Sequence, residues 1–357
     1  MSIIAGSIQL PSIRMLILGL TGHCNFACIY CYAYKQPQET MSFDTARRAV
    51  DLAAAGGQPF VLQFSGGEPL LAFDLLTEIV AYVKQRKLPA ILQIQTNASL
   101  LDRSMALFLR DRQIGVGISL DGRPSENDAQ RKLPGGGDTS RLILTGAAVL
   151  ASVGVETGIT CVVTDNNVRR LAGVVEMAYY LGNVRKIGFD LLRAQGRGIG
   201  VKAASAADLA SALREVLATA ERLERQTGRS LIFSHRERVH TLNTQCGGGF
   251  AHCHAMNGEA AFVDASGTIY ACASLSSFPE FRLGHVDTGI DPGRLTRITD
   301  TIRHGMGFCP ECDTFSLCGG ACFARWYGAG CAAEAYPPEC ALKQAFIRDF
   351  QQKQGLD

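Results

Sequence analysis

Three cysteines near the start of the chain have the spacing of a metal-binding loop. They lie in the stretch Cys24-Asn-Phe-Ala-Cys28-Ile-Tyr-Cys31. A four-iron cluster needs one thiolate per iron, so three cysteines leave one iron with an open position. An open metal position makes a site catalytic rather than structural. The spacing therefore predicts an iron-sulfur cluster that binds a ligand, with Tyr30 shielding it. The alternatives are a loop of free buried cysteines or a partial zinc site.

This run resembles the CxxxCxxC signature of radical S-adenosylmethionine (SAM) enzymes. The resemblance implies that the open iron binds the amine and carboxylate of SAM and delivers the electron that splits it. The products are methionine and a 5′-deoxyadenosyl radical. Cys24, Cys28 and Cys31 are then both the cluster ligands and the catalytic centre. An electron donor such as flavodoxin or ferredoxin is implied as a partner.

A second motif, Ser65-Gly66-Gly67-Glu68-Pro69, suits a ligand that carries an ammonium group. Glycines at 66 and 67 let the backbone approach a ligand closely, because a Cβ would block it. Exposed carbonyls there, with Glu68 nearby, suit the ammonium of SAM. The motif is similar to the GGEP motif of the same family, which holds the methionine amine. The alternative is an ordinary strand-to-helix turn.

Other residues are assigned to SAM by the same resemblance. Ser119 lies in Ser-Leu-Asp-Gly and Arg131 ends Asn127-Asp-Ala-Gln-Arg131, as in relatives that hold the SAM carboxylate with a serine and an arginine. Arginine suits bidentate contact with a carboxylate, although many loop arginines are only solvated. Asn97 and the backbone near Leu191 are further cofactor contacts implied by the family. The run 196–200, Gly-Arg-Gly-Ile-Gly, does not join a strand to a helix as a dinucleotide motif must. We interpret it as a flexible loop.

Nine of the thirteen cysteines follow residue 245. Cys253 and Cys272 flank residues 261–263 and 268–271, which predict a β-hairpin around the turn residues 264–267. Then comes Cys309-x2-Cys312-x5-Cys318-x3-Cys322, and later Cys340. This order resembles the SPASM domain of peptide-modifying radical SAM enzymes, which carries two auxiliary four-iron clusters.

The resemblance implies the ligand sets. The nearer auxiliary cluster takes Cys246, Cys253, Cys272 and Cys322; the outer cluster takes Cys309, Cys312, Cys318 and Cys340. With the SAM-binding cluster, three [4Fe-4S] clusters are expected. The alternative is a zinc ribbon, which needs only four thiolates where eight are present. Cys161 is interpreted as core packing and Cys331 is unassigned. His252 and His254 are interpreted as loop polarity.

The elements between these motifs alternate between short apolar runs and amphipathic stretches. Strands are predicted at 15–20, 60–64, 92–96, 116–120, 157–163 and 186–191, and helices at 42–55, 73–86, 102–112, 141–152, 167–181 and 205–225. Ser42 and Asp102 occupy N-cap positions. This order predicts an α/β fold with parallel strands and crossover helices. It resembles the partial (β/α)6 barrel of the radical SAM core, in which the motifs follow the carboxyl ends of strands. We expect a core domain at 1–232, including a bridging helix, and a SPASM domain at 233–357.

The bulk composition excludes several classes of protein. Basic and acidic residues nearly balance, at 35 and 33, so no nucleic-acid partner is predicted. The N-terminus has no signal-peptide pattern, and the apolar stretch at 15–20 is too short to span a membrane. A long, cysteine-rich chain of this kind is expected in a reducing cytoplasm, with its thiolates used as metal ligands.

These features predict a radical SAM oxidoreductase that abstracts hydrogen from a ribosomally made precursor peptide and forms an intramolecular thioether or C–C crosslink. Anaerobic sulfatase maturases, which form formylglycine, are an alternative, but they carry an aspartate as proton acceptor where this chain has Ala273. Radical SAM modification of RNA and a zinc-stabilised binding module are further alternatives. Only 23 residues precede Cys24, too few for a winged-helix leader-binding module. We therefore expect either a separate leader-binding protein or direct binding of the leader to the barrel.

Overall fold

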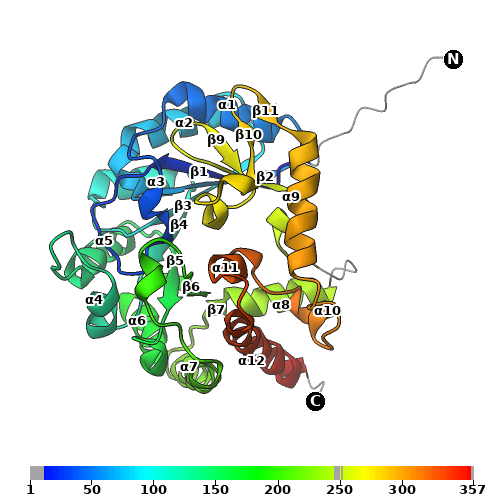
Figure 1. Cartoon of the computed structure of the whole chain (residues 1–357). Coiled ribbons are helices and arrows are strands. Elements are labelled where there is room, and N and C mark those ends of the chain that lie inside the picture. Colours follow the sequence, from blue (N-terminus) through cyan, green and yellow to red (C-terminus); the bar gives the residue numbers. More distant parts are fainter. Residues whose placement is uncertain (1–11, 245–249, 251, 355–357) are drawn as a thin grey trace.

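The computed structural model describes residues 12–244, 250 and 252–354. Within them, eleven strands form one sheet in the order β11-β10-β9-β8-β1-β2-β3-β4-β5-β6-β7 (Figure 1). The strands are β1 (Met15–Thr21), β2 (Phe60–Gly66), β3 (Ala90–Thr96), β4 (Gly115–Ser119), β5 (Thr157–Val163), β6 (Val184–Leu191), β7 (Ile232–Phe233), β8 (Ala260–Val263), β9 (Thr268–Tyr270), β10 (Arg282–His285) and β11 (Gly289–Ile290).

Helices connect and cover these strands. They are α1 (Phe43–Ala54), α2 (Phe73–Gln85), α3 (Arg103–Asp111), α4 (Pro124–Gln130), α5 (Ser140–Ser152), α6 (Ala172–Leu181), α7 (Ala206–Thr227), α8 (Ser234–Thr244), α9 (Pro292–Gly305), α10 (Phe315–Cys318), α11 (Phe323–Gly328) and α12 (Tyr336–Gln354). The predicted strands and helices are confirmed to within two residues at most ends. One predicted helix, 167–181, is interrupted: a 3-10 turn at Val168–Arg170 precedes α6.

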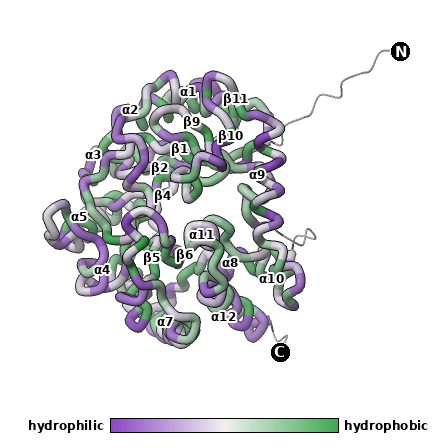
Figure 2. Tube along the Cα trace, viewed as in Figure 1, coloured by the Kyte–Doolittle hydropathy of each residue, from purple (hydrophilic) through white to green (hydrophobic). Residues whose placement is uncertain are grey.

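Strands β1 to β7 pair in parallel with their neighbours along the chain, as crossover helices require. The sheet does not close on itself, because β7 and β11 are its two edges. The expected α/β fold with a partial parallel barrel is therefore confirmed. Figure 2 shows hydrophobic residues along the strands and hydrophilic ones on the outer turns of the helices.

Local sequence explains the helix ends. The Ser42 hydroxyl accepts a hydrogen bond from the Thr45 amide at the start of α1, and Asp102 does the same for Met105 at the start of α3. Both predicted caps are thus present. Helix α1 buries Ala46, Ala49, Val50 and Ala53, whose spacing of three and four places them on one face.

The C-terminal region continues the same sheet. Strands β8 and β9 form the predicted hairpin, with Phe262 opposite Tyr270. The sequence does not predict that β8 also pairs in parallel with β1, from Met15 opposite Ala260 to Leu18 opposite Val263. The proposed domain boundary between residues 232 and 233 falls inside β7, which pairs with β6. It stays a prediction.

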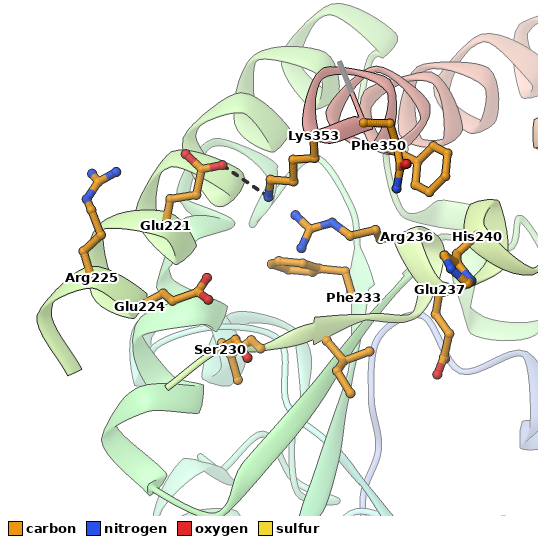
Figure 3. Close-up of a pocket in the computed structure, with 13 residues that line it drawn as sticks. Glu221, Glu224, Arg225, Ser230, Phe233, Arg236, Glu237, His240, Phe350 and Lys353 are labelled. Carbon is orange, nitrogen blue, oxygen red and sulfur yellow. Dashed lines mark ion pairs between the residues drawn. The ribbon is translucent and has the colours of Figure 1, made fainter. Parts of the chain in front are cut away.

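A groove of about 730 Å³ lies beside β7, between α7, α8 and α12 (Figure 3). In this groove Lys353 forms an ion pair with Glu221 at 3.3 Å. The guanidinium of Arg236 lies 5.4 Å from the centre of the Phe233 ring. No cysteine lines this groove. Among the described helices, none is both long and apolar enough to cross a membrane.

Candidate active site

The three N-terminal cysteines lie in the loop that follows β1. Backbone hydrogen bonds fasten this loop to the segment after α4, from the Ala27 amide to the Lys132 carbonyl and from the Ile29 amide to the Gln130 carbonyl. From the other side, the Arg197 side chain donates to the Cys28 carbonyl at 2.9 Å. These contacts fix the backbone of the loop that carries the three cysteines.

The segment that makes this last contact was interpreted from sequence as a flexible loop. It instead forms a 3-10 turn, Gly196–Gly200, against the cysteine loop. A Cβ at Gly196 would lie 2.5 Å from the Cys31 carbonyl oxygen, and φ there is +57°. Glycine is required because of this close approach, and not because of any phosphate ligand.

One cavity of about 210 Å³ collects the predicted residues of the core site. Its lining includes every cysteine and every SAM contact that the sequence assigns to this part of the chain: Cys24, Cys28, Tyr30, Cys31, Gly66, Gly67, Glu68, Asn97, Ser119, Arg131 and Leu191. They come from the ends of five different strands and the loops that follow them. Among the residues that the structure describes, the lining contains three thiols and no fourth cysteine or histidine. This donor set fits a four-iron cluster that lacks one protein ligand.

Burial controls the protonation of these thiols. It raises the pKa of Cys24 to about 12 and raises the pKa of Cys28, where the charge of Arg131 partly offsets it. Without a metal, Cys24 and Cys28 are therefore protonated at neutral pH. Because only thiolates bind iron, loading of a cluster releases their protons.

The Gly66-Gly67 turn packs on the start of the cysteine loop. A Cβ at Gly67 would lie 2.1 Å from the His23 carbonyl oxygen, and one at Gly66 would lie 2.4 Å from that of Thr21. Gly66 also has φ of +121°, which other residues rarely adopt. The glycines thus allow two segments of the chain to meet, a constraint that sequence reasoning ascribed to ligand approach alone.

Glu68 is a buried carboxylate at the edge of the cavity. It accepts hydrogen bonds from the Leu70 amide at 3.1 Å, the Thr96 hydroxyl at 2.5 Å and the Asn97 amide at 2.8 Å. Burial nevertheless raises its pKa from 4.5 to about 7, although these hydrogen bonds oppose the shift. A bound ammonium would favour the ionised form. Asn97 also reaches the cysteine loop, donating from its amide to Asn25 at 2.9 Å.

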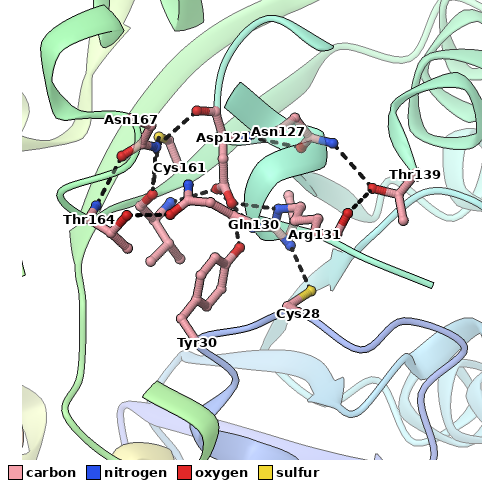
Figure 4. A network of polar contacts seen from close by, with 12 residues as sticks. Cys28, Tyr30, Asp121, Asn127, Gln130, Arg131, Thr139, Cys161, Thr164 and Asn167 are labelled. Carbon is pink, nitrogen blue, oxygen red and sulfur yellow. Dashed lines mark hydrogen bonds and ion pairs between the residues drawn. The ribbon is translucent and has the colours of Figure 1, made fainter. Parts of the chain in front are cut away.

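Arg131 has a fixed partner, Asp121 (Figure 4). Its Nη2 donates to Asp121 Oδ1 at 3.1 Å, and its Nε lies 3.1 Å from Asp121 Oδ2. The two side chains are 7% and 0% exposed. The Arg131 guanidinium also lies 5.5 Å from the centre of the Tyr30 ring, and its Nη1 is 4.0 Å from Cys28 Sγ. Its bidentate face is therefore used inside the protein, and its remaining nitrogen points toward the cysteine loop.

Ser119 and Leu191 are placed differently. Ser119 Oγ accepts a hydrogen bond from Gln95 Nε2 at 2.9 Å. The Leu191 carbonyl accepts from Arg325 Nε at 3.2 Å. Both residues line the cavity, and their contacts with SAM stay predictions.

The four cysteines assigned to the outer cluster, Cys309, Cys312, Cys318 and Cys340, line one small cavity with Glu339 and Lys343. Burial raises the pKa of Cys309 and Cys340, and the neighbouring thiols add to this effect. Four thiols around one cavity fit a cluster with complete protein coordination.

Three members of the nearer set are also neighbours. Burial, together with the nearby thiols of Cys272 and Cys322, raises the pKa of Cys253 to about 11. Although burial opposes ionisation of Cys322, Arg325 and Arg193 lower its pKa. The fourth predicted ligand, Cys246, lies outside the described residues.

These thiol groups differ in geometry from a single-ion site. Within residues 12–244, 250 and 252–354, no three His, Cys, Asp or Glu side chains converge closely enough to hold one metal ion. A four-iron cluster spreads its thiolates over separate irons. Cys161 is fully buried, which confirms its interpretation as core packing, and Cys331 is exposed. His254 pairs with Glu259 at 3.1 Å, whereas burial lowers the pKa of His252 to about 2.

Sequence reasoning missed several polar residues of the cavity, among them Tyr32, Asp190 and Arg193. The Arg193 guanidinium lies 5.1 Å from the centre of the Tyr32 ring and pairs with Asp190. Asp190 also accepts from Arg325 at 2.8 Å, which links the barrel to α11. The position of Asp190 and Arg193 at the carboxyl end of the strand predicted at 186–191 was a signal that could have identified these two.

Comparisons with known proteins agree with this geometry. The radical SAM superfamily model matches residues 18–178. An uncharacterised protein of Methanocaldococcus jannaschii is 32% identical over 269 residues, covering 75% of this chain and 87% of that protein. The cysteine-type anaerobic sulfatase-maturating enzyme of Clostridium perfringens is 30% identical over 45% of this chain, and the match spans only 47% of that enzyme. Mycofactocin maturase of Mycobacterium ulcerans is 27% identical over 90% of this chain and 86% of its own length.

Solved structures share the fold. The structure of anSMEcpe with bound AdoMet and the Cp18Cys peptide has a TM-score of 0.77 at 22% identity, covering 96% of this chain and 98% of that one. Streptococcus suis SuiB bound to the precursor peptide SuiA has a TM-score of 0.66 at 18% identity, covering 88% and 73%. The three-cysteine loop at the carboxyl end of β1, the matched family model and the similarity to the M. jannaschii protein lead to one conclusion: this chain belongs to the radical SAM superfamily.

Proposed function

We propose that this chain is a peptide-modifying radical SAM oxidoreductase that forms an intramolecular thioether or C–C crosslink in a ribosomally made precursor peptide. One observation carries the proposal: a single cavity is lined by three thiols, the Gly66-Gly67-Glu68 turn, and polar residues from the neighbouring strand ends. Relatives named as maturases, and similar folds solved with peptides, support the peptide as substrate class.

The bound cluster and SAM would together supply a 5′-deoxyadenosyl radical, which takes a hydrogen atom from an unactivated carbon. The residues of this chain have more defined tasks. Cys24, Cys28 and Cys31 hold the cluster. Glu68 and the carbonyls of the glycine turn bind the ammonium of SAM, with Ser119, Asn97 and Leu191 as further contacts. Asp121 and Tyr30 hold the Arg131 guanidinium beside Cys28, where it is a further contact for SAM.

We further propose two auxiliary clusters in residues 233–357, held by Cys246, Cys253, Cys272 and Cys322 and by Cys309, Cys312, Cys318 and Cys340. The cavity lined by the second set supports this assignment. We also propose two kinds of partner for this chain, an electron donor and a leader-binding protein.

The decisive experiment is anaerobic. The reconstituted, reduced protein is incubated with SAM, and 5′-deoxyadenosine is measured by mass spectrometry; Cys28→Ala is expected to abolish it. Co-expression with a short peptide encoded beside the gene follows. Loss of two hydrogens without a free aldehyde supports a crosslink, whereas an aldehyde that reacts with a hydrazide supports formylglycine formation, the alternative activity. An unchanged peptide mass contradicts the assignment of that peptide as the substrate.

A further inference from the structure

One lysine is buried among the four cysteines assigned to the outer cluster. Lys343 lines their cavity, its side chain is 5% exposed, and it lies about one turn after Cys340 in α12. Burial of an ammonium group is costly unless hydrogen bonds or opposite charges compensate for it. A neutral apolar side chain would fill the same space without that cost, so the charge of Lys343 needs an explanation of its own.

The ammonium of Lys343 has two partners. Its Nζ donates a hydrogen bond to the Gly320 carbonyl and lies 3.4 Å from Glu339 Oε1. Gly320 belongs to the short segment between Cys318 and Cys322, one cysteine from each proposed ligand set. The positive charge is therefore held against the segment that joins the two groups of thiols.

Glu339 does not neutralise this charge alone, because it has a second cationic partner. Its Oε2 pairs with Arg325, which also pairs with Asp190 at 2.8 Å. Asp190 is shared in turn with Arg193. Among the described residues, three buried or nearly buried cations thus share two carboxylates. One positive charge remains over in this group.

The neighbouring thiols experience the charge of Lys343. Burial raises the pKa of Cys309 and of Cys340, and the positive charge of Lys343 opposes the rise at both. The same charge acts on any anion that these thiols hold. The potential of an iron-sulfur cluster depends on its charge and surroundings. Because reduction adds a negative charge, a cation nearby stabilises the reduced form.

We propose that Lys343 is a positioning residue of the outer cluster, and that its buried ammonium raises the reduction potential of that cluster. The inference rests on the proposed function, because it assumes the outer cluster and its four cysteine ligands. After one hydrogen atom is removed from the peptide, closing a crosslink releases one proton to water and one electron. A cluster of raised potential accepts that electron more readily.

The test measures a potential and not turnover. The intact, anaerobically reconstituted protein is reduced stepwise, and its electron paramagnetic resonance signals are followed against the applied potential. The signal that Cys340→Ala removes identifies the outer cluster. Lys343→Met keeps the length of the side chain and removes its charge. It is expected to make reduction of the outer cluster roughly tenfold less favourable, a shift of about 59 mV to lower potential for one electron. An unchanged potential overturns the inference.

Further variants separate charge from structure. Glu339→Gln removes a negative charge with little change of shape and is expected to shift the potential of the outer cluster upward. Lys343→Arg restores the charge and should return the potential toward the wild-type value. Lys353→Met, also in α12 but with a side chain that is 43% exposed, is the control and should leave the potential unchanged. Shifts of the same sign in Lys343→Met and Glu339→Gln would overturn the inference. If Lys343→Met does not assemble the cluster, Glu339→Gln decides alone: an upward shift supports the inference and any other result overturns it.

The two proposals can be told apart when they fail. If Cys340→Ala removes neither iron nor a resonance signal, the outer cluster of the proposed function is wrong, and the role of Lys343 with it. If that signal is present and Lys343→Met leaves its potential unchanged, only the role of Lys343 is wrong.

Discussion

The Tyr30 hydroxyl donates a hydrogen bond of 2.5 Å to Asp121 Oδ2, joining the cysteine loop to the end of β4. The other oxygen of Asp121 accepts from the Val162 amide at 2.8 Å and from Arg131. The buried carboxylate of Asp121 therefore connects the cysteine loop, β5 and Arg131 (Figure 4).

This arrangement predicts that Asp121→Asn destabilises the protein by about 3–5 kcal/mol, because it leaves the charge of Arg131 buried without a counter-ion. Tyr30→Phe removes one hydrogen bond and is expected to lower the unfolding free energy by about 1–3 kcal/mol. Denaturant unfolding measures both effects. Asp138→Asn, whose carboxylate is 72% exposed, is the control and should change stability by less than about 0.5 kcal/mol. Equal effects of Asp121→Asn and Asp138→Asn would show that Arg131 does not depend on Asp121.

Glu68 predicts a pH dependence of SAM binding. Below pH 7 its carboxyl group is largely protonated and attracts an ammonium weakly, so affinity for SAM should rise as pH increases through about 7. Glu68→Gln should remove this dependence. Calorimetric titration between pH 6 and 8 measures it. An identical pH profile in both proteins would remove Glu68 from the SAM site.

The same group affects stability in the opposite direction. Its folded-state pKa of about 7 exceeds the unfolded value of 4.5, so the folded protein binds more protons between these values. In the SAM-free protein, the contribution of Glu68 to the free energy of unfolding is greatest below pH 4.5. It falls by about 3 kcal/mol in all as the pH rises from 4.5 through 7. The difference in unfolding free energy between wild type and Glu68→Gln isolates this contribution. A difference that does not vary with pH would contradict it.

Iron content tests the proposed auxiliary clusters. Three four-iron clusters correspond to about twelve irons per chain, and Cys340→Ala should remove about four of them. Cys331→Ser is the matched control, because Cys331 is exposed and unassigned. Iron and sulfide analysis of anaerobically reconstituted protein gives the result. Equal losses in both variants would dismiss the assignment of Cys340.

Arg325 predicts strong coupling between the barrel and the C-terminal region. It pairs with Asp190 of β6 and with Glu339 of α12, and its side chain is 12% exposed. Arg325→Ala removes the cation that Asp190 and Glu339 share, leaving each with one cationic partner, Arg193 and Lys343, and should destabilise the protein by about 1–3 kcal/mol. Thermal unfolding at neutral pH measures this. Retention of wild-type stability would mean that water reaches both carboxylates.

Much of the candidate site could be predicted because its signals are local. A thiol spacing, a glycine turn and a strand end each occupy a few consecutive residues, and parallel strands bring their carboxyl ends together. For this reason Cys24, Gly66 and Ser119 line one cavity, as the order of motifs predicts. The alternation in residues 157–163 likewise gave β5 its observed bounds.

What could not be predicted depends on long-range contacts. Arg131 is only an arginine in a polar segment until the fold places Asp121 beside it. The parallel pairing of β8 with β1 joins residues about 245 positions apart, and the sequence of neither strand identifies the other as its partner. Gly67 needs to be glycine because the His23 carbonyl lies against it, a contact between two loops.

Strand β1 lies between β2 and β8, so the loop of Cys24 and the hairpin that leads to Cys272 extend from a shared, hydrogen-bonded frame. The distance between these two groups of thiols is therefore set by hydrogen-bonded backbone and not by a hinge, and an electron passing between the proposed clusters would cross a fixed span. Turnover should proceed without any swinging apart of the two halves of the molecule.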